Sequence, residues 1–184
     1  MQENLDDIAL LERIGNGDEE AMSKLYTAYE SKLYTFALKK LNDSQAAADI
    51  VHEVMIAVWK SANNFQGRSK VKSWLFGIAH NKIVDHIRKD SRYDSEEFDE
   101  DLSDIETQTN EDLVEAAQNR DFLAYCLKKL SEFHRQVIHL AFFEDLGYGE
   151  IAEITGTPEG TIKTRVFHAK QLLKKCLAGK LGVA

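Results

Sequence analysis

Apolar side chains recur every three or four residues through most of this chain, which is the spacing of one face of an α-helix. The clearest series follows Asp18 and consists of Ala21, Leu25, Tyr29, Leu33, Phe36 and Ala37. Alternation of apolar and polar residues with period two, which marks a half-buried strand, is nearly absent. The chain has only one proline and 10 glycines to interrupt its helices. The pattern predicts an all-α fold.

Four helices are expected in the first half of the chain, at about 4–14, 19–41, 45–62 and 71–89. Residues 15–17 contain two glycines that end the first helix, and Asp18 has the short polar side chain that caps the start of the next one. Residues 42–44 break the second helix, and a polar loop at 63–70 separates the third helix from the fourth. We expect these helices to form one domain.

A strongly acidic stretch separates this domain from a second helical one. Residues 91–121 have a net charge of −10, and 91–111 contain few large apolar side chains. Such a segment cannot bury enough surface to offset the entropy lost on ordering. The apolar helical pattern resumes at Leu113. The sequence therefore predicts a helical domain at 1–90, a flexible acidic linker at 91–111 and a second helical domain at 112–184.

Composition and charge narrow the function classes. The chain of 184 residues is long enough for a stable core, and none of its apolar runs approaches the ~18–20 residues that span a bilayer. Residues 1–20 are acidic, unlike a secretory signal, so we expect a cytoplasmic protein without membrane insertion. The net charge of −8 argues against a nucleic-acid partner, but 60–90 and 155–184 each carry +5. Charge alone leaves open whether these basic blocks bind nucleic acid or are solvated helix faces.

Residues that could support catalysis or metal binding are not arranged as those functions require. His52 has no second histidine at the spacing of a helical zinc motif, and His80 and His86, six residues apart, do not share a helix face. The sequence has no Gly-rich phosphate loop and no nucleophile elbow. Cys126 and Cys176 lie 50 residues apart without a CxxC motif, so we expect buried or bystander thiols rather than a zinc or redox site. We therefore expect no enzyme activity, no metal and no cofactor.

The C-terminal part of the chain has the pattern of a helix-turn-helix. Ala152, Gly156 and Ile162 have the spacing at which a small residue, a turn glycine and an apolar anchor allow two helices to cross. We expect Thr157 to cap the second helix and Pro158 to occupy its first position.

At 100° per residue, the second of these helices has an inward and an outward face. The inward residues are Ile162, Val166, Ala169 and Leu173. The outward residues are Gly160, Lys163, Thr164, Phe167 and Gln171, with Thr161 and His168 at the edge. An exposed Phe beside Lys and Thr suits a major groove, where Lys reaches guanine acceptors and Phe contacts a thymine methyl. An ordinary helical hairpin with one exposed aromatic residue is the alternative.

Residues 65–89 mix aromatic and cationic side chains. The aromatic residues are Phe65, Trp74 and Phe76, and the cations are Arg68, Lys70, Lys72, Lys82, Arg88 and Lys89. Rings stack on unpaired bases and cations bind the backbone, so this mixture suits single-stranded or melted DNA. Trp74 fits a core position equally well, because its neighbours are apolar. Asn81 carries an amide that can read a base edge.

Several short motifs occur in a fixed order along the chain. In the first half they are Asp49-Ile50-Val51-His52-Glu53, Val58-Trp59, and Trp74 to Asn81 followed by Asp85 and Arg88. In the second half they are Arg135-Gln136-Val137-Ile138, Glu150-Ile151-Ala152, and Gly160 to Arg165 followed by Ala169. In this order and spacing, the chain resembles the extracytoplasmic-function (ECF, group IV) sigma factors of bacterial RNA polymerase over nearly its whole length.

The resemblance implies a role for each domain. The first resembles sigma region 2, which binds core polymerase and melts the minus-ten element, and the second resembles sigma region 4, which reads the minus-thirty-five element. The implied partners are promoter DNA, core polymerase through its β′ clamp helices and β subunit, and an anti-sigma factor that holds the protein inactive. The implied polymerase-binding residues are Asp49, His52 and Glu53. Those at the minus-ten element are Asn64, Phe65, Gln66, Gly67, Arg68, Ser69, Lys70, Trp74, Asn81 and Arg88. Those at the minus-thirty-five element are Thr161, Lys163, Thr164, Arg165, Phe167, His168 and Lys170.

The sequence departs from the family pattern at three of these positions. His52 stands where the family commonly has Gln, and Lys163 and His168 stand where it commonly has Arg. Lysine cannot form the bidentate fork of arginine, so the promoter sequence cannot be carried over from a relative. Two other functions remain open at this point. One is a stand-alone helix-turn-helix regulator whose first domain is a sensor or dimerisation module, and the other is a helical adaptor whose basic faces are only solvated.

Overall fold

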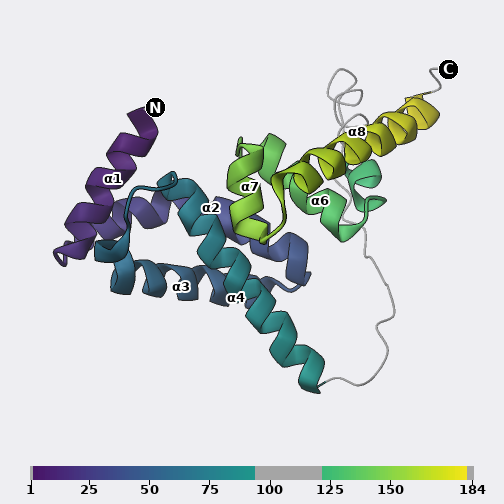
Figure 1. Cartoon of the computed structure of the whole chain (residues 1–184). Helices are drawn as coiled ribbons and strands as arrows, with labels where there is room; N and C mark the ends of the chain where they lie inside the picture. The colour runs from purple at the N-terminus through teal and green to yellow at the C-terminus, as the bar shows by residue number, and fades with distance from the viewer. Residues whose placement is uncertain (1, 94–121, 182–184) are drawn as a thin grey trace, which may run out of the picture.

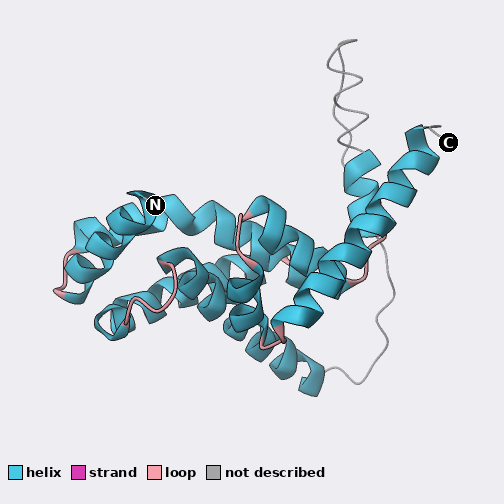
Figure 2. Ribbon diagram, turned by 45° about the horizontal axis from the view of Figure 1, so that its top comes forward, coloured by secondary structure: helices cyan, strands magenta, loops and turns pink. Residues whose placement is uncertain are grey.

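The computed structural model describes residues 2–93 and 122–181. Every regular element in these two ranges is helical (Figure 2), so the expected all-α fold is confirmed. Each range forms one helical unit (Figure 1). The acidic linker expected at 91–111 lies outside the described residues, apart from its first three positions.

The first unit contains the four α-helices that the apolar pattern predicts. They are α1 (Gln2–Gly15), α2 (Glu19–Leu41), α3 (Ser44–Ser61) and α4 (Val71–Tyr93). The Asp18 carboxylate caps α2 by accepting a hydrogen bond from the Ala21 N–H at 3.0 Å, as expected. A short 3₁₀ helix, η1 (Ala62–Asn64), begins the polar loop between α3 and α4. Residues 91–93, expected in the linker, are helical because no proline or glycine interrupts α4 there.

The core of this unit lies between α2, α3 and α4. All six apolar residues in the series after Asp18 are buried in α2. The Phe36 ring meets the Phe76 ring of α4 edge to face, with centroids 5.2 Å apart. Val54 and Val58 of α3 are fully buried in the same core.

The second unit contains the helix-turn-helix. Residues 122–128 are helical, and the elements that follow are α6 (Glu132–Ile138), the π-helical turn η2 (His139–Phe143), α7 (Tyr148–Thr155) and α8 (Glu159–Leu181). Gly156 ends α7 with a φ of 61°, a left-handed conformation that glycine adopts without strain. Ile162, Val166 and Ala169 are buried and Leu173 is partly buried, which confirms the expected inward face of α8.

The start of α8 differs from the expectation by one residue. The Pro158 carbonyl accepts the first helical hydrogen bonds, from the Thr161 N–H at 2.9 Å and the Ile162 N–H at 3.1 Å. The Thr157 hydroxyl donates to the Thr155 carbonyl at 3.4 Å, toward the end of α7. Thr157 therefore does not cap α8, because its hydroxyl is turned to the preceding helix.

The two units pack against each other. Helix α7 lies across α4 in Figure 1, and α4 and α7 are in direct contact. Leu140, Ile151 and Ile162 of the second unit belong to the same buried apolar cluster as Phe36 and Leu75 of the first. The sequence predicts two domains on a flexible tether, and the structure adds a shared core between them.

Candidate nucleic-acid and polymerase interfaces

Three of the site residues expected from the sequence lie together on the exposed side of α3. Asp49, His52 and Glu53 are all solvent-exposed. The Glu53 carboxylate lies 3.0 Å from the Lys82 ammonium of α4, and the Asp49 carboxylate accepts a hydrogen bond from the Gln45 amide at 3.3 Å. Lys82 thus neutralises one end of this acidic face. Asp49 presents a carboxylate that forms no ion pair within residues 2–93 and 122–181.

The polar loop after η1 borders a cavity of about 320 Å³. The residues that line it are Ile8, Leu11, Glu12, Ala62, Asn63, Phe65, Gln66 and Gly67. The Asn63 amide donates to the Gly15 carbonyl at 2.8 Å and so ties the loop to the end of α1. Gly67 has a φ of 67°, so the loop turns at a residue without a side chain. The contribution of α1 to this cavity could not be predicted from the sequence, because no motif connects Glu12 to a loop some fifty residues away.

The other expected minus-ten residues spread from this loop along α4. Asn64, Gln66, Arg68 and Lys70 are exposed, and Ser69 is partly buried. Two of the aromatic side chains pack together, because the Phe65 and Trp74 rings lie with centroids 5.2 Å apart. Both also pack against the buried core, so Trp74 is partly a core residue. Asn81 and Arg88 are exposed about two and four turns beyond Trp74 along the helix.

The outward face of α8 is as the sequence predicts. Lys163, Thr164 and Phe167 are exposed, Phe167 to 59%. The Lys163 ammonium lies 2.8 Å from the Glu159 carboxylate, and this hydrogen bond raises the pKa of Lys163. The Thr164 hydroxyl donates to the Gly160 carbonyl at 3.0 Å. An apolar ring and two polar groups therefore project from the first half of α8.

Two cations beside this face are positioned by aromatic rings. Arg165 stacks over the Phe133 ring of α6 at 5.0 Å from its centroid, and Lys170 lies 5.3 Å from the centroid of the Phe142 ring in η2. Such cation–π contacts orient long side chains that would otherwise sample many rotamers. The Phe rings are themselves more than half exposed. They could not be found from the sequence, because only the tertiary fold brings α6 and η2 to α8.

Each of the two units matches a known protein family. Residues 25–93 match the family described as Sigma-70 region 2, and residues 123–173 match Sigma-70, region 4. The ECF RNA polymerase sigma factor RpoE of Cereibacter sphaeroides is 32% identical over 170 residues, which cover 91% of this chain and 93% of that protein. The chain belongs to the ECF sigma factors of RNA polymerase.

Other relatives agree with this assignment. The ECF RNA polymerase sigma factor SigK of Mycobacterium tuberculosis (strain H37Rv) is 28% identical over 172 residues, covering 92% of this chain and 92% of that protein. A solved structure of the sigma factor RpoE in complex with the anti-sigma factor NepR from Bartonella quintana has a TM-score of 0.66 and 28% identity, covering 84% of this chain and 95% of that chain. The protein is thus a transcription initiation factor and not an enzyme. Membership of this family excludes the two alternative functions, a stand-alone helix-turn-helix regulator and a helical adaptor.

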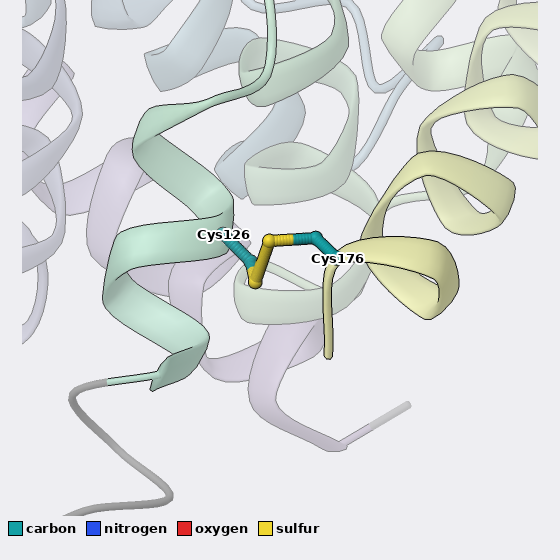
Figure 3. The surroundings of a disulfide bond; sticks show 2 residues. All are labelled: Cys126 and Cys176. Atoms are coloured by element: carbon teal, nitrogen blue, oxygen red, sulfur yellow. A yellow bond between two sulfur atoms is a disulfide. The ribbon is translucent and has the colours of Figure 1, made fainter. Parts of the chain in front are cut away.

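Region 4 of this sigma factor is cross-linked by a disulfide. Cys126, in the helical segment at 122–128, is bonded to Cys176 near the end of α8, with Cα atoms 5.8 Å apart (Figure 3). Cys126 is 1% exposed, and Cys176 is partly buried. The expectation of buried or bystander thiols was therefore wrong about pairing, because the two cysteines are bonded, although Cys126 is buried. A spacing of 50 residues gives no sign that folding brings the two helices side by side.

Nowhere in 2–93 or 122–181 do three His, Cys, Asp or Glu side chains gather as ligands of a metal ion would. Within the same residues, no helix is both long and apolar enough to cross a membrane.

Proposed function

We propose that the exposed face of α3 binds core polymerase, including its β′ clamp helices. Asp49 and Glu53 are four residues apart and so project from one helix face, where both can meet a basic surface. His52 lies exposed between them. Asp49 is the better position to perturb, since Lys82 already neutralises Glu53.

The test is core binding by the variant Asp49→Lys in the full chain. It should lose most of its affinity for core polymerase while its helical circular dichroism stays unchanged. The matched control is Glu153→Lys, the same charge reversal at an exposed residue of α7. Undiminished affinity of Asp49→Lys, or an equal loss in both variants, would remove the α3 face from the interface.

The loop at 64–70 and α4 are proposed to bind and melt the minus-ten element. The main support for this role is the cavity beside the loop. Its volume of about 320 Å³ lies at the lower end of the ~300–1,000 Å³ typical of ligand pockets, which leaves room for one extruded base. Phe65, Gln66 and Gly67 line the cavity, and Trp74 packs against Phe65. Asn64, Arg68, Ser69 and Lys70 lie in the same loop, and Asn81 and Arg88 are exposed further along α4.

Base capture predicts a specific kinetic defect. Gln66→Ala and Asn81→Ala should impair open-complex formation more than initial duplex binding, because unstacking costs a few kcal/mol that only a filled pocket recovers. Permanganate reactivity of promoter thymines measures the open complex. Lys89→Ala, at an exposed site far along α4, is the control for general loss of charge. Equal losses of closed and open complexes in the Asn81 variant would indicate a phosphate contact instead.

Region 4 is proposed to read the minus-thirty-five element with the exposed face of α8. Lys163, Thr164 and Phe167 project from the first half of the helix and are suited to base edges, with Thr161 at the rim. The flanking residues Arg165, His168 and Lys170 are suited to phosphates. For readout, Lys163 has to exchange its contact with Glu159 for a base.

An anti-sigma factor is proposed as the inhibitor of this sigma factor, acting in the cytoplasm where core polymerase works. The support is the solved relative, RpoE of Bartonella quintana, which is in complex with the anti-sigma factor NepR. In this scheme the unit ending at residue 93 serves polymerase and the minus-ten element, and the unit from residue 122 onward serves the minus-thirty-five element. Co-purification of the tagged full chain from its native cells, with and without an inducing stress, tests for such an inhibitor.

A further inference from the structure

The loop at 64–70, which runs beside α1 in Figure 1, is tied to this helix at both of its ends. Where the loop begins, the Asn63 amide donates to the Gly15 carbonyl at 2.8 Å. Where it ends, the Asn4 amide oxygen accepts from the Val71 N–H at 3.0 Å. The two hydrogen bonds lie near opposite ends of α1, ~16 Å apart at 1.5 Å per residue. One helix therefore holds both ends of the loop.

Helix α4 obtains the cap of its first turn from α1. The Lys70 carbonyl accepts a helical hydrogen bond from the Trp74 N–H at 3.1 Å, so Lys70 occupies the N-cap position of α4. A lysine side chain carries only donors, so it cannot accept from an N–H at the start of its helix. Asn4 supplies the missing acceptor to Val71. Because Val71 is fully buried, water cannot replace this hydrogen bond.

The end of α1 is capped in return by the residue that precedes the loop. The Gly15 carbonyl is one of the last carbonyls of α1, which have no partner within their own helix. Asn63 supplies the donor for it. This close approach requires a glycine, because a Cβ at residue 15 would overlap the end of the Asn63 side chain. The side chain of Asn63 is thereby fixed at the rim of the cavity.

Helix α1 is anchored to the rest of region 2 independently of the loop. Leu11 and Ile14 are buried in the core, with 2% and 1% of their surface exposed. The buried Asp7 carboxylate accepts a hydrogen bond from the buried Tyr29 hydroxyl of α2. The residues of α1 that line the cavity are Ile8, Leu11 and Glu12. The helix is thus a fixed support on one side of the cavity, and the loop lies on the other.

We propose that α1 is a positioning element of promoter melting, in which Asn4 and the Asn63–Gly15 pair hold the loop in the shape that captures a base. The proposal rests on the base-capture role proposed for the loop. A loop held in advance does not have to lose conformational freedom when the base enters, so capture costs less free energy. Neither Asn4 nor Gly15 is among the residues that line the cavity, so both act through the loop. Helix α1 also precedes residues 25–93, the range that matches Sigma-70 region 2.

The first test measures the hold of α1 on α4 by amide hydrogen exchange in the free full chain. Asn4→Ala removes the acceptor, so the Val71 amide should exchange about fivefold faster, as expected for the loss of a helix cap. Asn4→Asp keeps an acceptor and should restore the slow exchange. The matched control is Asn16→Ala, because the Asn16 amide donates to the Glu12 carbonyl at 2.9 Å within the same region of α1 and does not reach the loop. Equal exchange of Val71 in Asn4→Ala and the unaltered protein would overturn the proposal.

The second test measures promoter melting by the polymerase complex through the permanganate reactivity of thymines. Asn4→Ala should reduce open-complex formation about fivefold at unchanged initial duplex binding, and Asn4→Asp should restore it. Gly15→Ala should cause the same defect, because its Cβ displaces the Asn63 side chain. A purely structural role of residue 15 predicts the opposite result, since alanine forms helices better than glycine. Normal melting by both Asn4→Ala and Gly15→Ala would refute the positioning role.

The positioning role and base capture itself can fail separately. Gln66 lines the cavity and has no part in either tie to α1, so Gln66→Ala reports base capture alone. Defective melting by Gln66→Ala with normal melting by Asn4→Ala would refute positioning by α1 and leave base capture intact. Normal melting by Gln66→Ala with defective melting by Asn4→Ala and Gly15→Ala would refute base capture and support the hold of α1 on the start of α4. Unchanged amide exchange in α3 of each variant shows that region 2 stays folded.

Discussion

Acid is expected to open the contact between region 2 and region 4, because the contact holds His139 in its neutral form. Burial is the largest cause that lowers the pKa of His139 to about 4, and the charges of Lys39 and Lys72 lower it further. Lys39 belongs to α2, Lys72 to α4, and Phe36 of α2 covers the ring. The Glu144 carboxylate, which lies 3.4 Å from the ring, comes from region 4. Once the units separate, His139 should regain an ordinary pKa near 6.5.

The sign and the size follow from this difference in pKa. The packed arrangement of the two units favours the neutral form of His139. The contribution of His139 to the stability of the contact is therefore fully present above pH 6.5 and is lost as the pH falls toward 4. The loss is ~1.4 kcal/mol per pH unit, which gives ~2 kcal/mol at pH 5. His80, at the other end of the contact, also has a pKa lowered to about 4, by burial and by Lys40, against an opposing effect of Glu132. Its protonation acts in the same direction.

Two measurements check this prediction. Imidazole resonances in the intact chain should place the His139 pKa well below 6, and small-angle scattering should show a larger radius of gyration at pH 5 than at pH 7.5. His139→Gln should flatten the response, whereas His168→Gln, an exposed histidine of α8, should leave it unchanged. An intact chain in which His139 titrates near 6.5, or whose size is the same at both pH values, would refute the reasoning.

Three further predictions concern region 4. Replacing Cys126 and Cys176 by Ser should lower the free energy of unfolding of region 4 by ~4 kcal/mol, because a cross-link across 50 residues restricts the unfolded chain, and a reductant should reproduce the loss in the unaltered protein but not in the variant. Gly156→Ala should cost ~1 kcal/mol in a thermal melt, since the site has open space but a left-handed backbone; no change in melting temperature would contradict this. Lys163→Ala should cost ~1–3 kcal/mol of DNA-binding free energy at one position of the minus-thirty-five element and relax the base preference there. Lys170→Ala should weaken binding to all sequences alike and reduce the salt dependence of binding by ~1 in slope. Saturation mutagenesis of the element measures both, and an unchanged base preference for Lys163→Ala would show that Lys163 does not read a base.

Local features of this protein follow from sequence alone, because they depend on neighbours within a few residues. The apolar series in α2, the Asp18 cap and the Gly156 turn are each fixed by side chains within one or two helical turns. The two faces of α8 follow from 100° per residue once Ile162 is set inward. The order of the motifs also identifies the family, because the motifs lie on several helices of both units and together span most of the chain.

Contacts between distant segments were decided only by the tertiary structure. The cavity at the loop needs Glu12 from α1, and the disulfide joins residues 50 positions apart. A helical pattern gives the direction of a side chain but not its partner, so it could not pair Cys126 with Cys176. The sequence likewise places Lys72 and Glu144 in blocks of opposite charge, which predicts attraction but no geometry. That they meet as a buried pair depends on how two helical units pack, and packing is set by the shape of whole surfaces rather than by any one segment.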